Sequence, residues 1–168
     1  MTERTRKPAA IDDSAFLGRT VERLSVLIAD QSKAVFDDRG IVIPVRSCSL
    51  MTVLAKLETA SASDLARELG HSHQLVMQKI PKLVSLGLIR QGDDDQDARR
   101  RIFRLTDEGR EQLAKFEACS ALIDAAYDAL FAEVGDVRAL VDRTIEALGA
   151  LPLNSRIRDA AAPPKPTR

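Results

Sequence analysis

The segment from Ser61 to Thr106 constrains the fold of this 168-residue chain more than any other part of it. A helix-like stretch ends at Gly70, and a second stretch with helical apolar periodicity ends at Gly87. Two short β-like pieces then flank a polar tip at 92–99 that is rich in charge. A short helix, a tight turn, a second helix and a basic hairpin predict a winged helix-turn-helix. In such a module the second helix enters the major groove of DNA.

Cap residues support both helices of this segment. Ser61 followed by Asp64 is a variant of the capping box, and Ser72 is a good N-cap for the second helix. Pro81 lies inside the second helix, where a proline removes an amide donor and costs about 3 kcal/mol, so we expect a kink or a break there. The buried side of this helix is expected to comprise Leu75, Val76, Ile80, Leu83 and Val84.

Long apolar stripes flank this segment on both sides, with apolar residues stepping by three and four. A winged lobe needs only its own small core, so the surplus apolar surface predicts a homodimer. Polar or proline-rich composition predicts disorder at the two ends. The expected parts are a disordered tail at 1–10, a dimerisation helix at 11–40, the winged lobe at 45–106, dimerisation helices at 107–150 and a mostly disordered tail at 151–168.

The charge of the chain is balanced but unevenly distributed. The 25 Lys and Arg residues offset the 25 Asp and Glu residues, so the total charge gives no support to nucleic-acid binding. Four arginines nevertheless cluster in the predicted hairpin, at 99–101 and 104, and local charge matters more for a binding face. We expect a cytoplasmic protein, since we find no secretory signal, no membrane-spanning apolar run, and two distant cysteines that suit free thiols.

Polar residues at the start of the second helix are the expected DNA contacts. A glutamine amide can bond adenine in bidentate fashion, and a helix N-terminus attracts phosphate. In the wing, Arg99 is expected to enter the minor groove, where narrow A·T tracts attract arginine. The alternative is a helical hairpin used only for packing, followed by an exposed charged loop. The expected DNA-binding set is Ser61, Ser72, His73, Gln74, Met77, Gln78, Asp97, Arg99 and Arg100.

Other chemistry-bearing residues suggest little beyond binding. His71 and His73 resemble half a metal site, but structural zinc needs four ligands, so we expect no metal and no other cofactor. A reactive thiol at Cys48 would suit oxidant sensing, although burial in the core is the favoured interpretation. Arg46 and Cys48 are candidates for a ligand pocket. The chain contains no phosphate-binding loop or nucleophile motif, so we do not expect an enzyme.

Several short motifs add a family resemblance to this order of parts. They are Asp64-Leu65-Ala66, Gly87-Leu88-Ile89, Asp97-x-Arg99 and Leu105-Thr106-x-x-Gly109. Over residues 14–149 the chain resembles the MarR family of bacterial transcription regulators. The resemblance implies an obligate homodimer with interlocked outer helices, one winged helix-turn-helix per subunit, and a small-molecule or oxidant-sensing site in many members.

The resemblance also assigns a role within the wing. It implies that Asp97 holds the guanidinium of Arg99 or braces the hairpin. Ala98 departs from the family pattern, which usually has a basic residue between that Asp and that Arg. Wing contact is therefore either weaker here or restored by Arg100 and Arg101.

We therefore expect a mainly α-helical fold with a small β-hairpin wing. The expected function is that of a homodimeric, sequence-specific regulator that binds a pseudo-palindromic operator in double-stranded DNA, acts as a repressor and is released by a small-molecule effector. The alternative is a winged-helix adaptor for protein partners without DNA binding, which the zero net charge and Pro81 favour. Salt dependence separates the two, because phosphate contacts release counterions.

Overall fold

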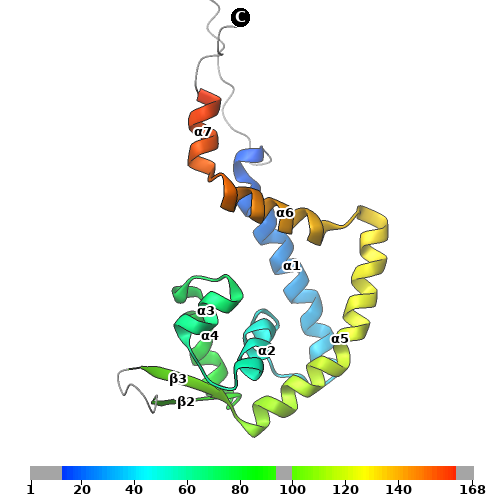
Figure 1. Ribbon diagram of the computed structural model, residues 1–168. Coiled ribbons are helices and arrows are strands. Elements are labelled where there is room, and N and C mark those ends of the chain that lie inside the picture. The colour runs from blue at the N-terminus through cyan, green and yellow to red at the C-terminus, as the bar shows by residue number, and fades with distance from the viewer. Residues whose placement is uncertain (1–12, 94–99, 162–168) are drawn as a thin grey trace, which may run out of the picture. The chain divides into compact units, whose positions relative to one another are not determined.

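A computed structural model describes residues 13–93 and 100–161 (Figure 1). The chain divides into two compact units, one ending at Cys119 and one beginning at Ser120. The expected mainly helical fold with a small β-wing is confirmed. The elements are the 3-10 turns η1 (Ser14–Phe16) and η2 (Val45–Ser47), the helices α1 (Leu17–Asp38), α2 (Cys48–Leu57), α3 (Ala62–Leu69), α4 (His73–Ser85), α5 (Asp107–Val134), α6 (Val137–Ala150) and α7 (Leu153–Ala161), and the strands β1 (Ala60–Ser61), β2 (Ile89–Asp93) and β3 (Arg101–Leu105).

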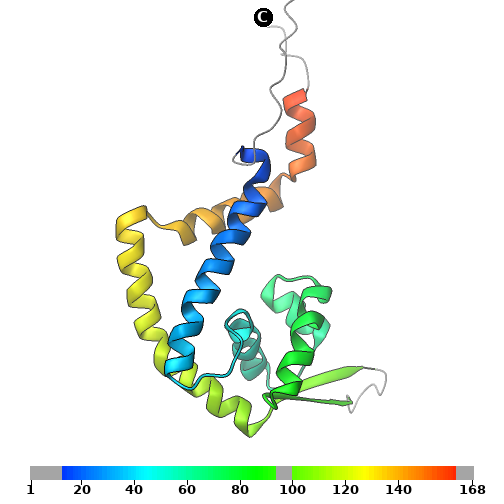
Figure 2. The same cartoon turned by 180° about the vertical axis from the view of Figure 1, so that it is seen from behind.

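Helices α2, α3 and α4 and a three-stranded sheet form the winged lobe within the first unit. Strand β3 lies between β1 and β2 and pairs antiparallel with both, so that Phe103 stands opposite Ala60 on one side and Gln91 on the other. Figure 2 shows α3 and α4 side by side, with the β2–β3 hairpin extending beyond them. Fully buried aliphatic side chains from each layer hold the lobe together, among them Leu50, Leu54, Leu65, Val76, Leu83 and Leu88.

The turn between α3 and α4 follows the sequence signals closely. The Asp64 amide donates to Ser61 Oγ over 3.2 Å and the Ser61 amide donates to Asp64 Oδ2 over 3.0 Å, which confirms the capping box. Gly70 ends α3 at a φ of +62°, a left-handed conformation that glycine adopts without a Cβ penalty. Ser72 Oγ then accepts the Leu75 amide at 3.2 Å and caps α4.

Helix α4 corrects two expectations. It runs uninterrupted from His73 to Ser85, so the break expected at Pro81 is absent. Pro81 is exposed, so water can solvate the carbonyl that lost its amide partner, while three side chains of α4 anchor the helix in the core. Leu75 and Val84 were expected inside, yet they are 39% and 42% exposed. The buried stripe is narrower than expected and consists of Val76, Ile80 and Leu83.

The Leu105-Thr106-x-x-Gly109 motif joins the wing to α5. Thr106 Oγ1 donates to the Gly87 carbonyl at 2.5 Å and accepts the Gly109 amide at 2.9 Å, so this side chain caps α5 and fixes the end of α4. Gly109 passes so close to the Leu88 carbonyl that a Cβ at this position would lie 1.9 Å from its oxygen. Only glycine fits there without a backbone shift.

The long helices of the first unit pack through α1 and the first half of α5. The rings of Phe36 and Phe116 meet edge to face with centroids 5.8 Å apart. The buried Gln112 side chain accepts the Val42 amide at 2.9 Å, which ties the connector after α1 to α5. The N-terminal half of α1 is different, because none of its side chains between Leu17 and Leu27 is buried.

The second unit begins inside α5 and contains α6 and α7. Gly135 interrupts the helical pattern at a φ of +87°, and the Asp136 carboxylate caps α6 by accepting the Ala139 amide at 2.8 Å. Helix α7 contradicts the expected disorder over much of 151–168, because Arg156 donates to the Ala147 and Leu151 carbonyls and thereby satisfies the end of α6. Among the described residues 120–161 not one is buried.

The expected disorder at 1–10 lies outside the described residues, and the assignment of the outer segments to dimerisation stays a prediction. Within the part of the chain that the structure describes, we find no helix that is both long enough and apolar enough to cross a membrane.

Candidate nucleic-acid interface

The first two turns of α4 present a polar face to solvent. His73 and Met77 are four residues apart, as are Gln74 and Gln78, so the two pairs lie along one side of the helix. All four side chains are exposed, and they lie away from the buried stripe of α4. Ser72, the N-cap, is exposed beside them. The structure therefore brings five of the nine expected contact residues together at the N-terminal end of α4, which also carries the positive end of the helix dipole.

Ser61 occupies a different position from the one expected of a surface contact. Its side chain is buried, and its hydroxyl donates to Asp64 Oδ2 at 2.7 Å while accepting the Asp64 amide. The capping box at the start of α3 uses both hydrogen-bonding functions of this hydroxyl. Ser61 thus belongs to the support beneath the interface.

Arg100, which directly precedes β3, connects the wing to this support. Its Nη2 donates to Asp64 Oδ2 in a very short ion pair and to Ser61 Oγ at 3.3 Å. Arg67, from the same turn of α3, donates to the other oxygen of Asp64 at 2.9 Å. One carboxylate therefore holds two guanidinium groups, one from α3 and one from the hairpin. No sequence pattern predicts this pairing, because 36 residues separate Arg100 from Asp64.

These contacts determine the ionisation of the carboxyl group. The hydrogen bond with the Ser61 side chain is the largest influence on Asp64 and lowers its pKa to about 2. Burial, the next largest, raises the pKa, while the Ser61 amide, Arg67 and Arg100 lower it further. Asp64 is therefore ionised at neutral pH, where its ion pairs with Arg67 and Arg100 are intact.

The β2–β3 hairpin carries the rest of the wing. Asp93 and Arg101 are direct cross-strand partners, so opposite charges face each other near the end of the described hairpin. Asp97 and Arg99, which were expected to contact DNA at the wing tip, lie outside the described residues. Their roles stay predictions.

A hollow of about 300 Å³ lies between α1 and η2. Its walls are mainly apolar, and Arg46 from η2 is its one charged lining residue. Lys79 of α4 donates to the Arg46 carbonyl at 2.6 Å, so the same residue that lines the hollow is also tied to α4. Partial burial, followed by the nearby charge of Arg46, lowers the pKa of Lys79. The sequence predicted Arg46 as a pocket candidate, but it did not predict its link to α4.

Neither cysteine has the surroundings of a reactive thiol. Cys48 is buried and does not line the hollow beside Arg46. Burial raises its pKa to about 12, so the thiol stays protonated, as the packing interpretation expected. Cys119 is also a buried free thiol.

The histidine pair does not form part of a metal site in the described chain. Partial burial lowers the pKa of His71, and its Nδ1 has no hydrogen-bond partner among the described residues. His73 lies exposed on α4. Within residues 13–93 and 100–161, no three histidine, cysteine or acidic side chains are grouped so that they could hold a metal ion.

Comparisons with known proteins agree with this geometry. Residues 43–100, which span α2 to the base of the wing, match the sequence model of the MarR family. No curated protein matches the chain. Several solved structures share its fold. One is the PcaV transcriptional regulator from Streptomyces coelicolor in complex with its natural ligand, with a TM-score of 0.63 and 17% identity over 87% of this chain and 99% of that one. A second is a probable transcriptional regulator from Pseudomonas aeruginosa, with a TM-score of 0.60 and 21% identity over 80% of this chain and 99% of that one. A third is reduced AbfR bound to DNA, with a TM-score of 0.58 and 21% identity over 80% of this chain and 94% of that one.

Proposed function

Because the family match and the shared fold support a winged-helix regulator of the MarR family, we propose that this chain is a homodimeric transcriptional repressor. It binds a near-palindromic operator in double-stranded DNA with half-sites about one helical turn apart. A small-molecule effector releases it by favouring a lobe arrangement that does not fit consecutive grooves.

The exposed polar face of α4, held beside a basic wing, carries the DNA-binding part of this proposal. Gln74 and Gln78 offer side-chain amides for base edges, and the capped N-terminus of α4 offers amides for phosphate. Arg100, just before β3, fixes the wing to the start of α3 through Asp64. The helix and the wing can therefore engage adjacent parts of the duplex as one body.

Exposed apolar side chains on the outer helices support the homodimer. Helix α1 exposes Leu17, Val21 and Leu24, and the described part of the second unit buries no residue of its own. Helices with apolar stripes and no core are unstable in water as isolated elements. A second copy of the chain would cover these surfaces and set the spacing of the two reading helices.

The hollow beside Arg46 supports the effector part. It is large enough for a small organic molecule, and its apolar walls with one guanidinium suit a weakly polar ligand that carries an anionic group. A ligand that shifts η2 acts on the Arg46 carbonyl and hence on Lys79 of α4. The solved relative PcaV binds a natural ligand, and AbfR binds DNA.

The test is duplex binding by the full chain, using operator fragments selected from random DNA. We expect Gln74→Ala and Gln78→Ala each to weaken binding of the selected operator by about 1–3 kcal/mol. Each substitution should also relax the sequence preference of the protein. Arg99→Ala is expected to cost a similar amount through the wing. Ser49→Ala, at an exposed polar residue on α2 outside the proposed dimer and DNA contacts, is the control and should leave affinity unchanged.

Salt dependence decides between regulator and adaptor. A regulator loses affinity steeply as salt rises, because each phosphate contact releases counterions. An adaptor binds no duplex even in dilute buffer, and that result would sink the proposal.

A further inference from the structure

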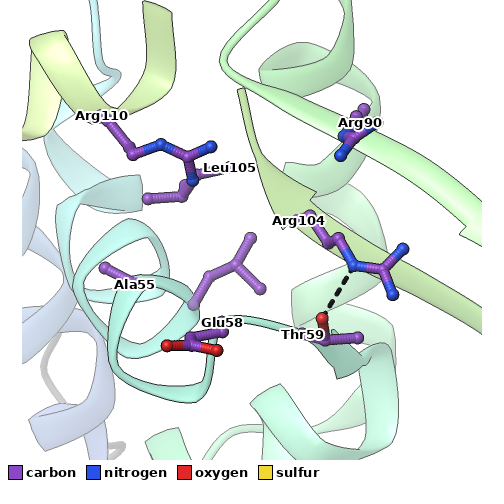
Figure 3. Close-up of a pocket in the computed structure, with 8 residues that line it drawn as sticks. Ala55, Glu58, Thr59, Arg90, Arg104, Leu105 and Arg110 are labelled. Atoms are coloured by element: carbon purple, nitrogen blue, oxygen red, sulfur yellow. Dashed lines mark hydrogen bonds between the residues drawn. The ribbon is translucent and has the colours of Figure 1, made fainter. Parts of the chain in front are cut away.

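A second hollow, of about 490 Å³, lies on the winged lobe away from α3 and α4 (Figure 3). It is formed by the end of α2, the residues that follow it, the bases of β2 and β3, and the start of α5. Three arginines line it, one from each of β2, β3 and α5, and Glu58 is the only carboxylate among the lining residues. Ala55 is the exposed apolar residue of the lining, and the buried Leu54 and Leu105 lie behind it. The volume suits a small ligand.

The two strand arginines of this hollow are placed against each other. Arg90 and Arg104 are direct cross-strand partners, an arrangement of like charges that destabilises a hairpin. Arg104 Nε donates to Thr59 Oγ1 at 2.8 Å, but neither arginine forms an ion pair within residues 13–93 and 100–161. A permanently charged guanidinium pair that forms no ion pair with any described residue suits an anionic ligand.

The third arginine lies across the hollow, as Figure 3 shows, with Arg110 on the α5 side and Arg104 on the strand side. Arg110 has one ion pair, with Asp107 at 3.1 Å, but the Asp107 side chain is 98% exposed. Such an exposed ion pair contributes little to stability, so Arg110 can exchange Asp107 for another anionic partner at little cost.

Backbone strain at the rim provides an independent observation. Glu58 adopts a φ of +60° and a ψ of −43°, and it is the only non-glycine residue with positive φ in the described chain. The Thr59 amide donates to the Leu57 carbonyl at 2.6 Å across it, which makes a γ-turn of the rare, strained form. Strain of this kind clusters at ligand clamps and switch regions.

We propose that this hollow binds a small dicarboxylate. One carboxylate is held by Arg90 and Arg104, the other by Arg110, and a short aliphatic body lies against Ala55. Three guanidinium groups against one carboxylate leave the lining with a formal charge of +2, which a dianion neutralises. Because the ligand contacts both strands of the wing and the end of α2, its binding braces the base of the wing.

Calorimetric titration of the full chain with glutarate, without DNA, tests this site independently of the proposed function. We expect glutarate to bind to the wild-type chain. Arg90→Gln and Arg104→Gln should each lower the affinity for glutarate by at least about tenfold, because each removes charged hydrogen bonds to the ligand. Arg101→Gln, on the same hairpin but outside the hollow, is the matched control and should keep the wild-type affinity.

Thermal unfolding of the same variants guards against misfolding as an explanation. Arg90→Gln removes the opposition of like charges between the strands, so without ligand the variant should unfold at a temperature no lower than that of wild type. The rise in unfolding temperature that glutarate causes in wild type should be absent in the variant.

Four results would overturn the site. They are no binding of glutarate at millimolar concentration, equal binding by Arg90→Gln, equal affinity for butyrate or inorganic phosphate, and a loss of duplex affinity in Arg90→Gln without any glutarate effect. The last result would make these arginines contacts to the DNA backbone.

Discussion

At the scale of single residues, Asp64 is the side chain on which most of the interface support converges. It accepts hydrogen bonds from Ser61 and pairs with Arg67 and Arg100, so three segments depend on its negative charge. An ionised carboxylate with several charged partners stabilises the folded state only while it stays ionised.

Acid should therefore weaken the protein through this group. The pKa of Asp64 is about 2 in the folded chain against an ordinary value of 3.8, so the stabilisation is complete above about pH 4 and is lost as the pH falls towards 2. Since the side chain is only 19% exposed, the effect is on the order of 2 kcal/mol. Denaturant unfolding at several pH values should show that Asp64→Asn has a lower free energy of unfolding than wild type at pH 7. The free energy of unfolding of the variant should also change less as the pH falls from 4 to 2. Parallel plots of unfolding free energy against pH for wild type and Asp64→Asn would contradict this prediction. Asp142→Asn on α6 is the control for the loss of a charge.

Glu58 offers a second prediction at this scale, because its strain can be removed without touching the core. Glu58→Gly should raise the free energy of unfolding by about 1 kcal/mol, since the relief of a strained positive φ exceeds the entropy cost of glycine. For a chain of this size that corresponds to a rise of about 2–4 °C in Tm. Glu58→Ala removes the same carboxylate but keeps the strain. Equal Tm values for the two variants would show that the γ-turn stores no energy.

At the scale of elements, the junction of the wing with α5 depends on one close backbone approach. Gly109→Ala would place a methyl group 1.9 Å from the Leu88 carbonyl oxygen, and the preference of helices for alanine is too small to offset that clash. We expect a loss of about 3 kcal/mol in the free energy of unfolding, measured with urea. Gly149→Ala in α6 meets no atom within 4 Å and should stabilise the chain slightly. A neutral Gly109→Ala would mean that α5 shifts freely.

Elements that depend on local chemistry were predictable from the sequence. Ser61, Gly70 and Ser72 act on backbone groups a few residues away, so their cap and turn roles follow from residue type and spacing. The Arg100–Asp64 ion pair and the Arg90–Arg104 pairing depend on how the chain folds back, and no spacing rule gives them.

The errors made from the sequence have physical causes. Pro81 costs α4 one hydrogen bond, but burial of Val76, Ile80 and Leu83 outweighs that loss. Helix α7 escaped prediction because only Leu153 and Ile157 mark its apolar side, and because Arg156 joins it to α6 by hydrogen bonds that a periodicity search does not detect.

At the scale of the whole molecule, the second unit cannot be accounted for as an isolated body. Ile145 is 63% exposed, and Val141 and Leu148, on the same side of α6, are exposed as well. A helical segment of this composition without a buried residue gains too little from burial to offset its ordering entropy. Folding of this unit is therefore expected to be coupled to association with a second copy.

Charge placed on α6 tests that coupling. Ile145→Glu should abolish or greatly weaken dimerisation, because it would bury an unpaired carboxylate in the proposed interface. Sedimentation velocity should show wild type as a dimer and Ile145→Glu shifted to monomer, and only wild type should unfold at a temperature that rises with protein concentration. Operator affinity should fall with the dimer, since a single reading helix loses the gain of binding two half-sites together. Glu146→Lys changes charge at the neighbouring, exposed position and should leave both association and DNA binding as in wild type. A dimeric Ile145→Glu would place the interface elsewhere, and a monomeric wild type would remove the basis for a paired half-site operator.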